Sequence, residues 1–191
     1  ALWDKSGNFW LCAGVDGLFR WNPRTRESRV FKKELEADKA RGSVTSLGSL
    51  FEDSRGQLWL ARTWGFSVRL PERDTFLHFL FSERDDHNFQ QIQRFAEDRY
   101  GRVWLCGAEG WVGYALSHEP ERGLVKKMDL KTIVGIEDLY DLTTDANGDL
   151  WGYSERILLK INAADLSVTT YSFAYGVGEE DFFAFKFLPD G

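Results

Sequence analysis

The sequence predicts an all-β fold, a β-propeller built from four repeats of four antiparallel strands, as a fragment of a larger propeller or as a small closed ring. In a motif that occurs four times, an aspartate is followed by glycine after three residues and by tryptophan after six. The four tryptophans, Trp10, Trp59, Trp104 and Trp151, recur at intervals of 45 to 49 residues. Repeats of this length typically hold the four strands of one propeller blade.

The order of elements within a repeat is clearest in the second copy. Residues 44–52 carry an interrupted apolar pattern, as expected for the innermost strand near a crowded axis. The motif then predicts a hairpin turn, because the Asp53 carboxylate can accept backbone hydrogen bonds and Gly56 tolerates a positive φ. Residues 57–61 follow as the second strand, in which Trp59 is large enough to fill the space between neighbouring blades.

Two more strands complete each repeat, and the fourth strand of the third repeat is the least regular. Helix is expected only as a frayed turn over 32–41, which has good helix formers but few apolar positions. The predicted third strands are 18–21, 66–70, 111–114 and 157–161, and the predicted fourth strands are 28–31, 75–79, about 124–128, and 168–172.

The repeats predict a single propeller segment over 1–191, because one shared pattern leaves no room for a domain break. The repeats lie at about 1–43, 44–91, 92–135 and 136–180, with a partial fifth at 181–191. If 181–187 supplies an inner strand beside Trp10, the four blades close into a small ring; otherwise they are an arc. Because the chain starts inside a repeat and stops where a fifth turn is due, we expect a piece of a longer protein.

Composition excludes several classes of partner. A net charge of −6 argues against nucleic acid, and the basic stretch 22–29 is interpreted as a solvated loop. No apolar stretch is long enough to span a bilayer. Cys12 and Cys106 occupy the same position in non-adjacent repeats, too far apart for a disulfide, and are interpreted as small buried apolar residues.

No catalytic, metal or cofactor site emerges from the sequence, so the chain is not expected to be an enzyme. Residues 145–149 resemble the start of a calcium loop, but the twelfth position is Arg156 where a carboxylate is needed. The histidines at 78, 87 and 118 have no ligand spacing, and His118 is interpreted as an exposed loop residue. Carboxylate pairs at 85–86 and 179–181 leave a propeller hydrolase as the third alternative.

The aligned repeats resemble the two-component regulator propeller repeat, with residues 2–23 as the closest copy. The resemblance covers all four repeats, although residues 151–156 lack the Gly-Leu of the loop. It implies a periplasmic sensory segment of a hybrid histidine kinase or diguanylate cyclase receptor, with signalling catalysis in other parts of the parent protein. Many members of the family respond to glycan fragments, and a carbohydrate-sensing role is therefore implied.

Alternating strand direction predicts one binding face. The loops between second and third strands and the loops before first strands should emerge opposite the Asp-x-x-Gly turns. The candidate ligand-binding residues on that face are Asp16, Arg62, Trp64, Glu109 and Glu155 from the first set of loops, and Asp86, His87, Gln90, Gln91, Glu137 and Asp138 from the second.

Arg62 and Trp64 are the strongest candidates, because the other repeats have no tryptophan at that place. An indole stacks on a sugar ring and an arginine supplies fixed hydrogen-bond donors, which suits an oligosaccharide. The alternative interpretation is that Trp64 covers the adjacent blade. The leading hypothesis is thus a sensory segment that binds a glycan or a neighbouring sensor domain of the same receptor, with a homodimer as a further possibility. The alternative is a protein–protein interaction scaffold without a small ligand.

Overall fold

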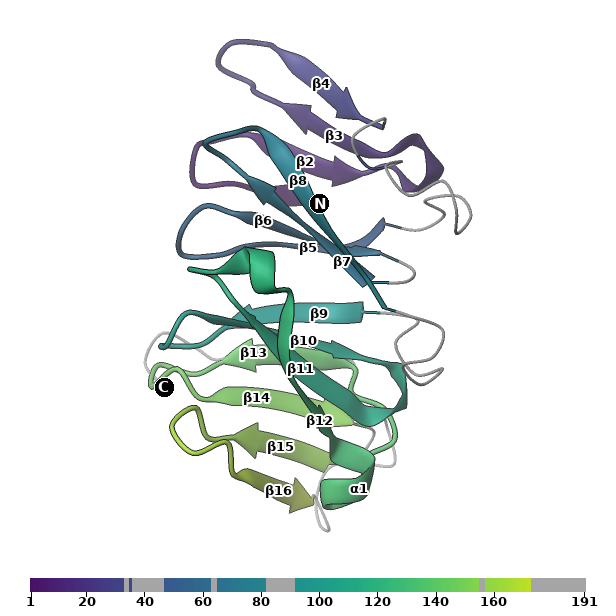
Figure 1. Ribbon diagram of the computed structural model, residues 1–191, viewed down its shortest axis with the longest axis vertical. Coiled ribbons are helices and arrows are strands. Elements are labelled where there is room, and N and C mark those ends of the chain that lie inside the picture. The colour runs from purple at the N-terminus through teal and green to yellow at the C-terminus, as the bar shows by residue number, and fades with distance from the viewer. Residues whose placement is uncertain (33–34, 36–46, 63–64, 82–91, 155–156, 173–191) are drawn as a thin grey trace. The chain divides into compact units, whose positions relative to one another are not determined.

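The computed structural model describes residues 1–32, 35, 47–62, 65–81, 92–154 and 157–172. Their strands form four separate four-stranded antiparallel sheets, and in each sheet the strands lie in chain order (Figure 1). The chain is therefore an all-β propeller segment, as predicted, and each sheet is one blade. It divides into two compact units, 1–92 and 93–191, each of which contains two blades. The boundary falls where the second repeat gives way to the third.

The first unit contains the first two blades. Its innermost strand in the second blade shifts register between Leu47 and Leu50, within the stretch whose apolar pattern is interrupted. The strands are β1 (Leu2–Trp3), β2 (Phe9–Cys12), β3 (Leu18–Trp21), β4 (Ser28–Phe31), β5 (Leu47–Glu52), β6 (Leu58–Arg62), β7 (Gly65–Leu70) and β8 (Thr75–Leu80), with the 3-10 turn η1 (Gly14–Asp16) between β2 and β3.

The second unit contains the third and fourth blades. Its outer strand pairing shifts register between Tyr114 and Ala115, so the third blade is irregular where the sequence predicted it. The strands are β9 (Ile92–Glu97), β10 (Arg102–Gly107), β11 (Trp111–Leu116), β12 (Leu124–Asp129), β13 (Asp141–Thr144), β14 (Leu150–Ser154), β15 (Ile157–Ile161) and β16 (Val168–Ser172), and the short helices are η5 (Ala108–Gly110), η6 (Pro120–Arg122) and α1 (Leu130–Val134).

Helix α1 was not predicted from the sequence, and neither were the 3-10 turns η1, η5 and η6. Asp129 caps α1, since the Asp129 carboxylate accepts hydrogen bonds from the Thr132 backbone N–H at 3.2 Å and hydroxyl at 2.7 Å. Gly135 ends it in the left-handed conformation. The predicted helical turn over 32–41 lies outside the described residues except for Lys32 and Leu35.

The carboxylate of the motif aspartate accepts backbone hydrogen bonds in all four motif turns. In the third blade, Asp98 Oδ1 accepts hydrogen bonds from the backbone N–H groups of Tyr100 at 2.8 Å and Arg102 at 3.1 Å. The glycine of the turn has a φ of +70°, which costs a residue without Cβ little. The backbone bonds agree with the sequence prediction, since equivalent bonds to the turn aspartate occur in the other three repeats.

The second carboxylate oxygen binds the tryptophan of the motif, and this contact explains the six-residue spacing. An indole N–H that is buried without an acceptor is costly, and Trp10 and Trp104 are fully buried. The Nε1–Oδ2 distances are 2.7 Å for Trp10–Asp4, 2.9 Å for Trp59–Asp53, 2.7 Å for Trp104–Asp98 and 2.9 Å for Trp151–Asp145.

Trp10 and Trp104 fill the space between blades, as predicted. We call the packing of the first blade on the second the first joint, and that of the third blade on the fourth the second joint. In the first joint Trp10 forms one core cluster with Phe31 of its own blade and with Leu58 and Leu60 of the next. The Trp10 ring stacks on the Phe31 ring at 5.7 Å.

The second joint repeats this arrangement. Trp104 belongs to one core cluster with Leu150, Leu159 and Ile161 of the fourth blade, so the indole packs on three aliphatic side chains. Trp104 is fully buried, so the joint removes its whole apolar surface from water. Trp151 is only partly buried, and it stacks on Tyr171 at 5.6 Å.

Candidate functional site

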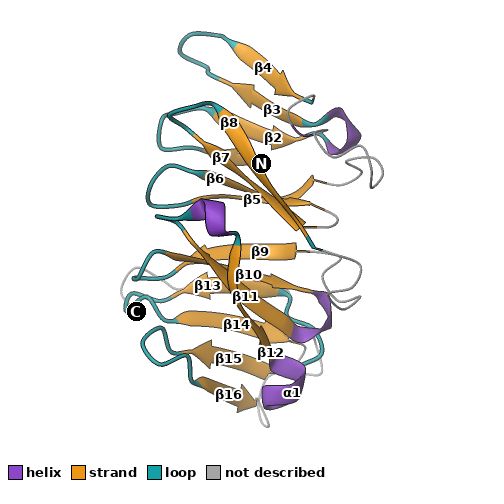
Figure 2. Ribbon diagram, in the orientation of Figure 1, coloured by secondary structure: helices purple, strands orange, loops and turns teal. Residues whose placement is uncertain are grey.

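The loops that carry the candidate residues lie opposite the motif turns within each unit. In the first unit η1 follows β2, and in the second unit η5 follows β10, so both sit at the far end of the strand that leaves the motif turn (Figure 2). We call this end of each unit the loop side and the opposite end the turn side. The predicted placement of the inter-strand loops is therefore correct for the described loops.

On the loop side of the second unit, two predicted loops meet. The backbone N–H of Glu109 in η5 donates to Asp138 Oδ1 at 3.1 Å, which joins the third blade to the segment that leads into the fourth. Lys131 of α1 is 2.9 Å from the Glu137 carboxylate, and this hydrogen bond raises the pKa of the lysine. Glu109, Glu137 and Lys131 are exposed. The side therefore presents a cluster of carboxylates with one cation beside them.

The backbone that presents Glu109 is tightly constrained. Glu109 itself has a φ of +63°, which is unfavourable for a residue with a side chain and is common at functional positions. The next residue, Gly110, lies so close to the Ile136 carbonyl oxygen that a Cβ would be 2.0 Å from it. Only glycine fits there, so the third blade contacts the Ile136 segment through bare backbone.

On the loop side of the first unit, the two described candidates differ. The Asp16 side chain is 78% exposed and lies 3.6 Å from Lys32 Nζ. Arg62 is buried at the end of β6. Its guanidinium donates to the Leu35 carbonyl oxygen at 3.0 Å and contacts Ser67 Oγ at 3.4 Å and His78 Nδ1 at 3.2 Å.

Arg62 thus ties the second blade to the Leu35 segment that follows the first blade. This role was not predicted from the sequence, because Leu35, which links Arg62 to the preceding blade, is 27 residues away along the chain. The remaining candidates, Trp64, Asp86, His87, Gln90, Gln91 and Glu155, lie outside the described residues.

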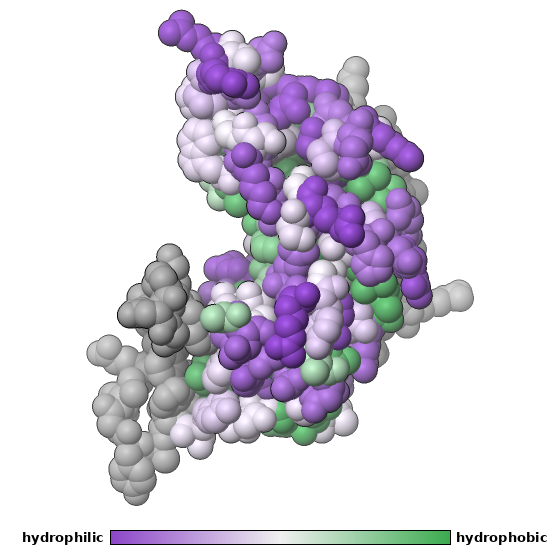
Figure 3. All heavy atoms as spheres, turned by 90° about the vertical axis from the view of Figure 1, so that its left-hand side faces the viewer, coloured by the Kyte–Doolittle hydropathy of each residue, from purple (hydrophilic) through white to green (hydrophobic). Residues whose placement is uncertain are grey.

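The turn side carries a different set of polar contacts, and hydrophilic residues predominate on it in each unit (Figure 3). In the first joint the Lys5 backbone N–H donates to Glu52 Oε2 and the Lys5 ammonium to the Asp53 carbonyl oxygen, both at 2.8 Å. In the second joint Arg99, at the same motif position as Lys5, donates to the Asn147 carbonyl oxygen at 2.5 Å. One cation after the motif aspartate therefore holds the next blade's turn in both joints.

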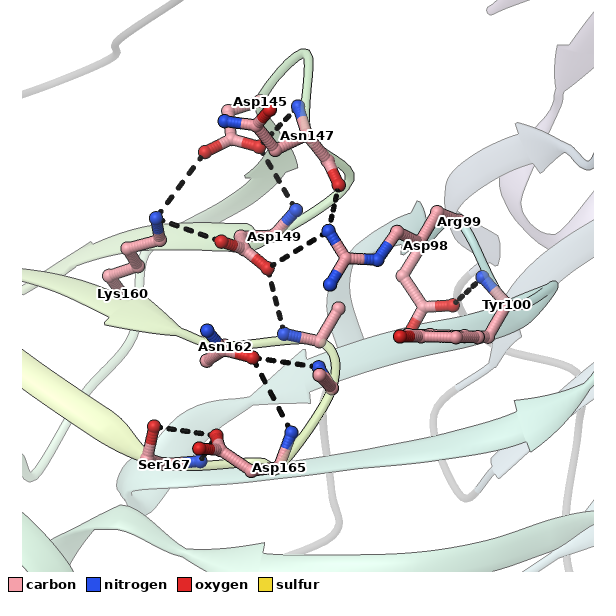
Figure 4. Close-up of polar contacts among 12 residues, drawn as sticks. Asp98, Arg99, Tyr100, Asp145, Asn147, Asp149, Lys160, Asn162, Asp165 and Ser167 are labelled. Carbon is pink, nitrogen blue, oxygen red and sulfur yellow. Dashed lines mark hydrogen bonds and ion pairs between the residues drawn. The ribbon is translucent and has the colours of Figure 1, made fainter.

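Asp149 is the centre of the polar network in the second joint (Figure 4). Its carboxylate lies 2.8 Å from Lys160 Nζ, accepts the Ala163 backbone N–H at 2.9 Å and is 3.8 Å from Arg99. The hydrogen bond from Lys160 is the main reason that the pKa of Asp149 lies below its ordinary value and that of Lys160 above. The network is fully ionised at neutral pH.

The first joint has its own ionic centre, Asp74. One oxygen accepts from Arg69 Nε at 2.7 Å and the other from Arg29 at 2.5 Å, while Arg20 lies 3.7 Å away. Burial opposes ionisation of Asp74, but the hydrogen bond and charge of Arg69 outweigh it, so its pKa is lowered. The guanidinium groups of Arg69 and Arg20 also lie 5.1 Å and 5.7 Å from the Trp10 ring.

The two cysteines are free thiols in different units. Burial raises the pKa of Cys106 to about 12 and that of Cys12 to about 11, so neither is a thiolate at neutral pH. Within the described ranges no three histidine, cysteine or acidic side chains are grouped closely enough to hold a metal ion. The described helices include none with the length and apolar character needed to cross a bilayer.

Similar folds occur in solved structures of bacterial receptors and surface proteins. The extracellular domain of BT3049 from B. thetaiotaomicron, described as a hybrid two-component system, matches 94% of this chain with a TM-score of 0.70 and 17% identity. The extracellular domain of BT4673 from the same organism matches 88% with a TM-score of 0.67 and 19% identity. PorZ of Porphyromonas gingivalis, described as an essential surface component of the type-IX secretion system, matches 90% with a TM-score of 0.64 and 15% identity.

At these identities the likeness establishes the fold, a propeller segment. Two of these neighbours are extracellular domains of two-component systems. The chain spans 23% and 24% of the lengths of those two domains and 26% of PorZ. No protein-family model and no curated protein matches the chain.

Proposed function

We propose that this chain is a sensory segment of an extracytoplasmic receptor domain, and that it binds its ligand with the loop side and has no enzymatic activity of its own. The observation that carries the proposal is the likeness, over 94% of the chain, to an extracellular domain of a hybrid two-component system. Kinase or cyclase output then lies in another part of the parent protein, on the far side of an inner membrane, and this segment is periplasmic.

The ligand that we propose is an oligosaccharide. The loop side of the second unit offers exposed carboxylates, Glu109 and Glu137, which can accept hydrogen bonds from sugar hydroxyls. The loop of the second repeat, in the first unit, carries Trp64 as a separate candidate, whose indole suits stacking on a pyranose ring. The cation beside Glu137, Lys131, can donate to the same kind of hydroxyl.

The contact between Glu109 and Asp138 connects ligand binding to blade packing. Because the η5 loop of the third blade is bonded to the segment before the fourth, a ligand held by both loops would favour one arrangement of the two blades. A ligand shifts an equilibrium only by its difference in affinity for the two arrangements. Sensing then consists of that difference, passed on to other domains of the receptor.

The test is a glycan array probed with the 191-residue chain, followed by calorimetric titration of any glycan bound. Glu109→Gln should weaken binding at the second unit at least about tenfold, because it removes a direct contact, and Trp64→Ala should do the same for binding at the first unit. Glu121→Gln, an exposed glutamate of η6 at the other end of the third blade, is the matched control and should bind as the wild type does. Equal binding by all four proteins would contradict the proposed site.

An interaction scaffold is the second candidate, and the likeness to PorZ, a surface component of a secretion system, favours it. In that case no glycan on the array binds, and cross-linking in the native organism captures a protein at the loop side. The Trp64→Ala variant would then give less of the cross-linked protein than the wild type, and neither the wild type nor the variant would bind a glycan on the array.

A further inference from the structure

The turn side of the first unit carries an excess of exposed positive charge. Two motif turns and two outer hairpin turns emerge there, and they span 4–8, 53–57, 22–27 and 71–74. The exposed cations on these turns are Lys5, Arg24, Arg26, Arg55 and Arg73. On the same four turns, which are described in full, only Glu27 and Glu72 are exposed anions. We call the five cations the basic surface.

The four turns form one continuous surface. The Asn22 side-chain amide donates to the Asn8 side-chain oxygen at 2.8 Å, which joins the hairpin turn of the first blade to its motif turn. The Lys5 contacts described above join the two motif turns. The ion pair of Arg29 with Asp74 joins the first blade to the hairpin turn of the second. The surface thus extends both along one blade and across to the next.

The arginines of the first hairpin turn are not needed to form it. The hairpin turns of the first and fourth blades share one geometry, in which the side chain of the opening asparagine accepts a hydrogen bond from the backbone N–H two residues later, at 3.0 Å and 2.8 Å. The fifth residue of each turn has a positive φ, +61° and +64°. Ala164 and Leu166 stand in the fourth blade where Arg24 and Arg26 stand in the first. The fold therefore accepts uncharged residues at both positions.

The ion pairs beside these turns leave a further excess of positive charge. Asp74 is shared by Arg20, Arg29 and Arg69, so one carboxylate faces three guanidinium groups. Arg29 is exposed and Arg20 is half-buried, so their charge acts on the solvent nearby. Residues 93–191 account for all of the net negative charge of the chain. The turn side of the first unit therefore attracts anions although the chain as a whole is acidic.

The layout of the basic surface fits a planar anionic partner. The motif turn and the hairpin turn of one blade are two strand spacings apart, about 10 Å, and the second blade adds another pair of turns. A single small anion cannot meet cations spread over four turns of two blades. A linear polyanion follows one line of charges, whereas a layer of lipid phosphates meets an array that extends in two directions. Basic side chains near such a layer each add to the attraction.

We propose that the basic surface binds the phosphate headgroups of an anionic lipid bilayer, so that the turn side of the first unit faces the membrane and its loop side faces away. The contact is peripheral and is held by charge. This inference rests on the proposed function in one respect, that the segment belongs to an extracytoplasmic domain of a membrane receptor. It does not depend on the ligand of the loop side.

Flotation of the 191-residue chain with lipid vesicles tests the proposal. The chain should float with vesicles of equal parts phosphatidylglycerol and phosphatidylcholine, stay behind with pure phosphatidylcholine, and be released by high salt. Arg24→Gln and Arg73→Gln should each lower the partition coefficient about fivefold, since one basic group near an anionic membrane contributes about 1 kcal/mol. Adding Arg26→Asn, a residue that tolerates positive φ, should bring the combined loss to about a hundredfold.

Two controls separate this proposal from a general effect of charge and from the proposed glycan site. Lys126→Gln removes one exposed cation of β12 in the second unit and should float as the wild type does. Glu109→Gln should also float unchanged, so that vesicle binding and glycan binding can fail independently. Circular dichroism of each variant checks folding, which these exposed turn substitutions should leave intact.

Four results would overturn the proposal. They are no binding to the anionic vesicles at low salt, equal binding to the phosphatidylcholine vesicles, a loss in Lys126→Gln as large as in Arg24→Gln, and binding of soluble polygalacturonate without binding of vesicles. The last result would assign the arginines to an acidic polysaccharide.

Discussion

The first and second joints share the packing of a motif tryptophan, held by the motif aspartate, on the next blade, and we call this shared packing the frame. They differ in their ion pairs, which we call the locks. In both, an indole held by the motif aspartate packs on aliphatic residues of the next blade. The first joint adds Asp74 of the second blade with Arg20 and Arg29 of the first, whereas the second adds Asp149 of the fourth blade with Arg99 of the third, and Lys160 of its own blade also binds Asp149. The frame is thus a property of the repeat, and the lock is a property of each pair of blades.

The difference indicates how each kind of interaction contributes. Apolar packing removes area from water wherever the blades meet and is not directional. The ionic locks are directional, and each requires charged groups at positions that only two particular blades supply. We therefore expect the frame to control stability and the locks to control which blades pair.

The largest effect should come from breaking the frame. Asp98→Ala removes the acceptor for the Trp104 indole and for Arg102, whose Nε lies 2.5 Å from the carboxylate. Both partners are buried or nearly so, and we expect a loss of about 3 to 5 kcal/mol in the free energy of unfolding, measured by denaturant titration. Asp165→Ala, in an exposed turn, is the control and should stay close to the wild type. A loss below about 1 kcal/mol for Asp98→Ala would contradict the proposed role of the frame.

A smaller effect should follow from removing one lock. Asp74→Ala leaves Arg69, a side chain only 10% exposed, without its acceptor, and we expect the first unit to lose about 2 kcal/mol. Hydrogen exchange should show faster exchange in β4 and β8 and unchanged protection in β14 and β15. Asp149→Ala should give the reverse pattern. Equal changes in both units for either variant would show that the locks are not specific to their joints.

Acid should weaken both locks in the same pH range. The pKa values of Asp74 and Asp149 lie below the ordinary value of 3.8, so the folded state binds these protons less readily than the unfolded chain does. Their contribution is complete above about pH 5 and is lost as the pH falls through the folded values, below about 4. Denaturant titrations at several pH values check this. Asp149→Asn should flatten the acid limb for the second unit, and an unchanged limb would exclude Asp149 as its source.

The smallest effect should come from the motif cations. Lys5→Ala and Arg99→Ala each remove an exposed donor to a turn carbonyl of the next blade, and water replaces much of what is lost. We expect local rises in hydrogen exchange at the turns of residues 53–57 and 145–149, and these differences should shrink in high salt. A change as large as that of Asp98→Ala would mean that these contacts are part of the frame.

The motif spacing alone predicted the blades and the packing of Trp10 and Trp104 between them, because the size of the tryptophan side chain and the period of the repeat can both be read from the sequence. The six-residue spacing of aspartate and tryptophan also allows the hydrogen bond to the indole, but this bond was not predicted because only the folded hairpin brings the two side chains together. Helix α1 was missed because five residues are too few for a periodic signal.

The candidate site was predicted less completely. Strand direction correctly assigned the loops with Asp16 and Glu109 to the loop side. Arg62 is buried among Leu35, Ser67 and His78, and its contact with Leu35, 27 residues away, has no local signal in the sequence. The ligand-binding role of the candidates stays a prediction.

The carboxylate-to-indole bond makes each blade self-sufficient in one respect. The aspartate, the glycine and the tryptophan all come from seven consecutive residues, so a duplicated stretch of gene that includes them carries its own means of orienting the indole. A blade could then be gained or lost as a cassette, and only the ionic partners at the new boundaries would have to adapt.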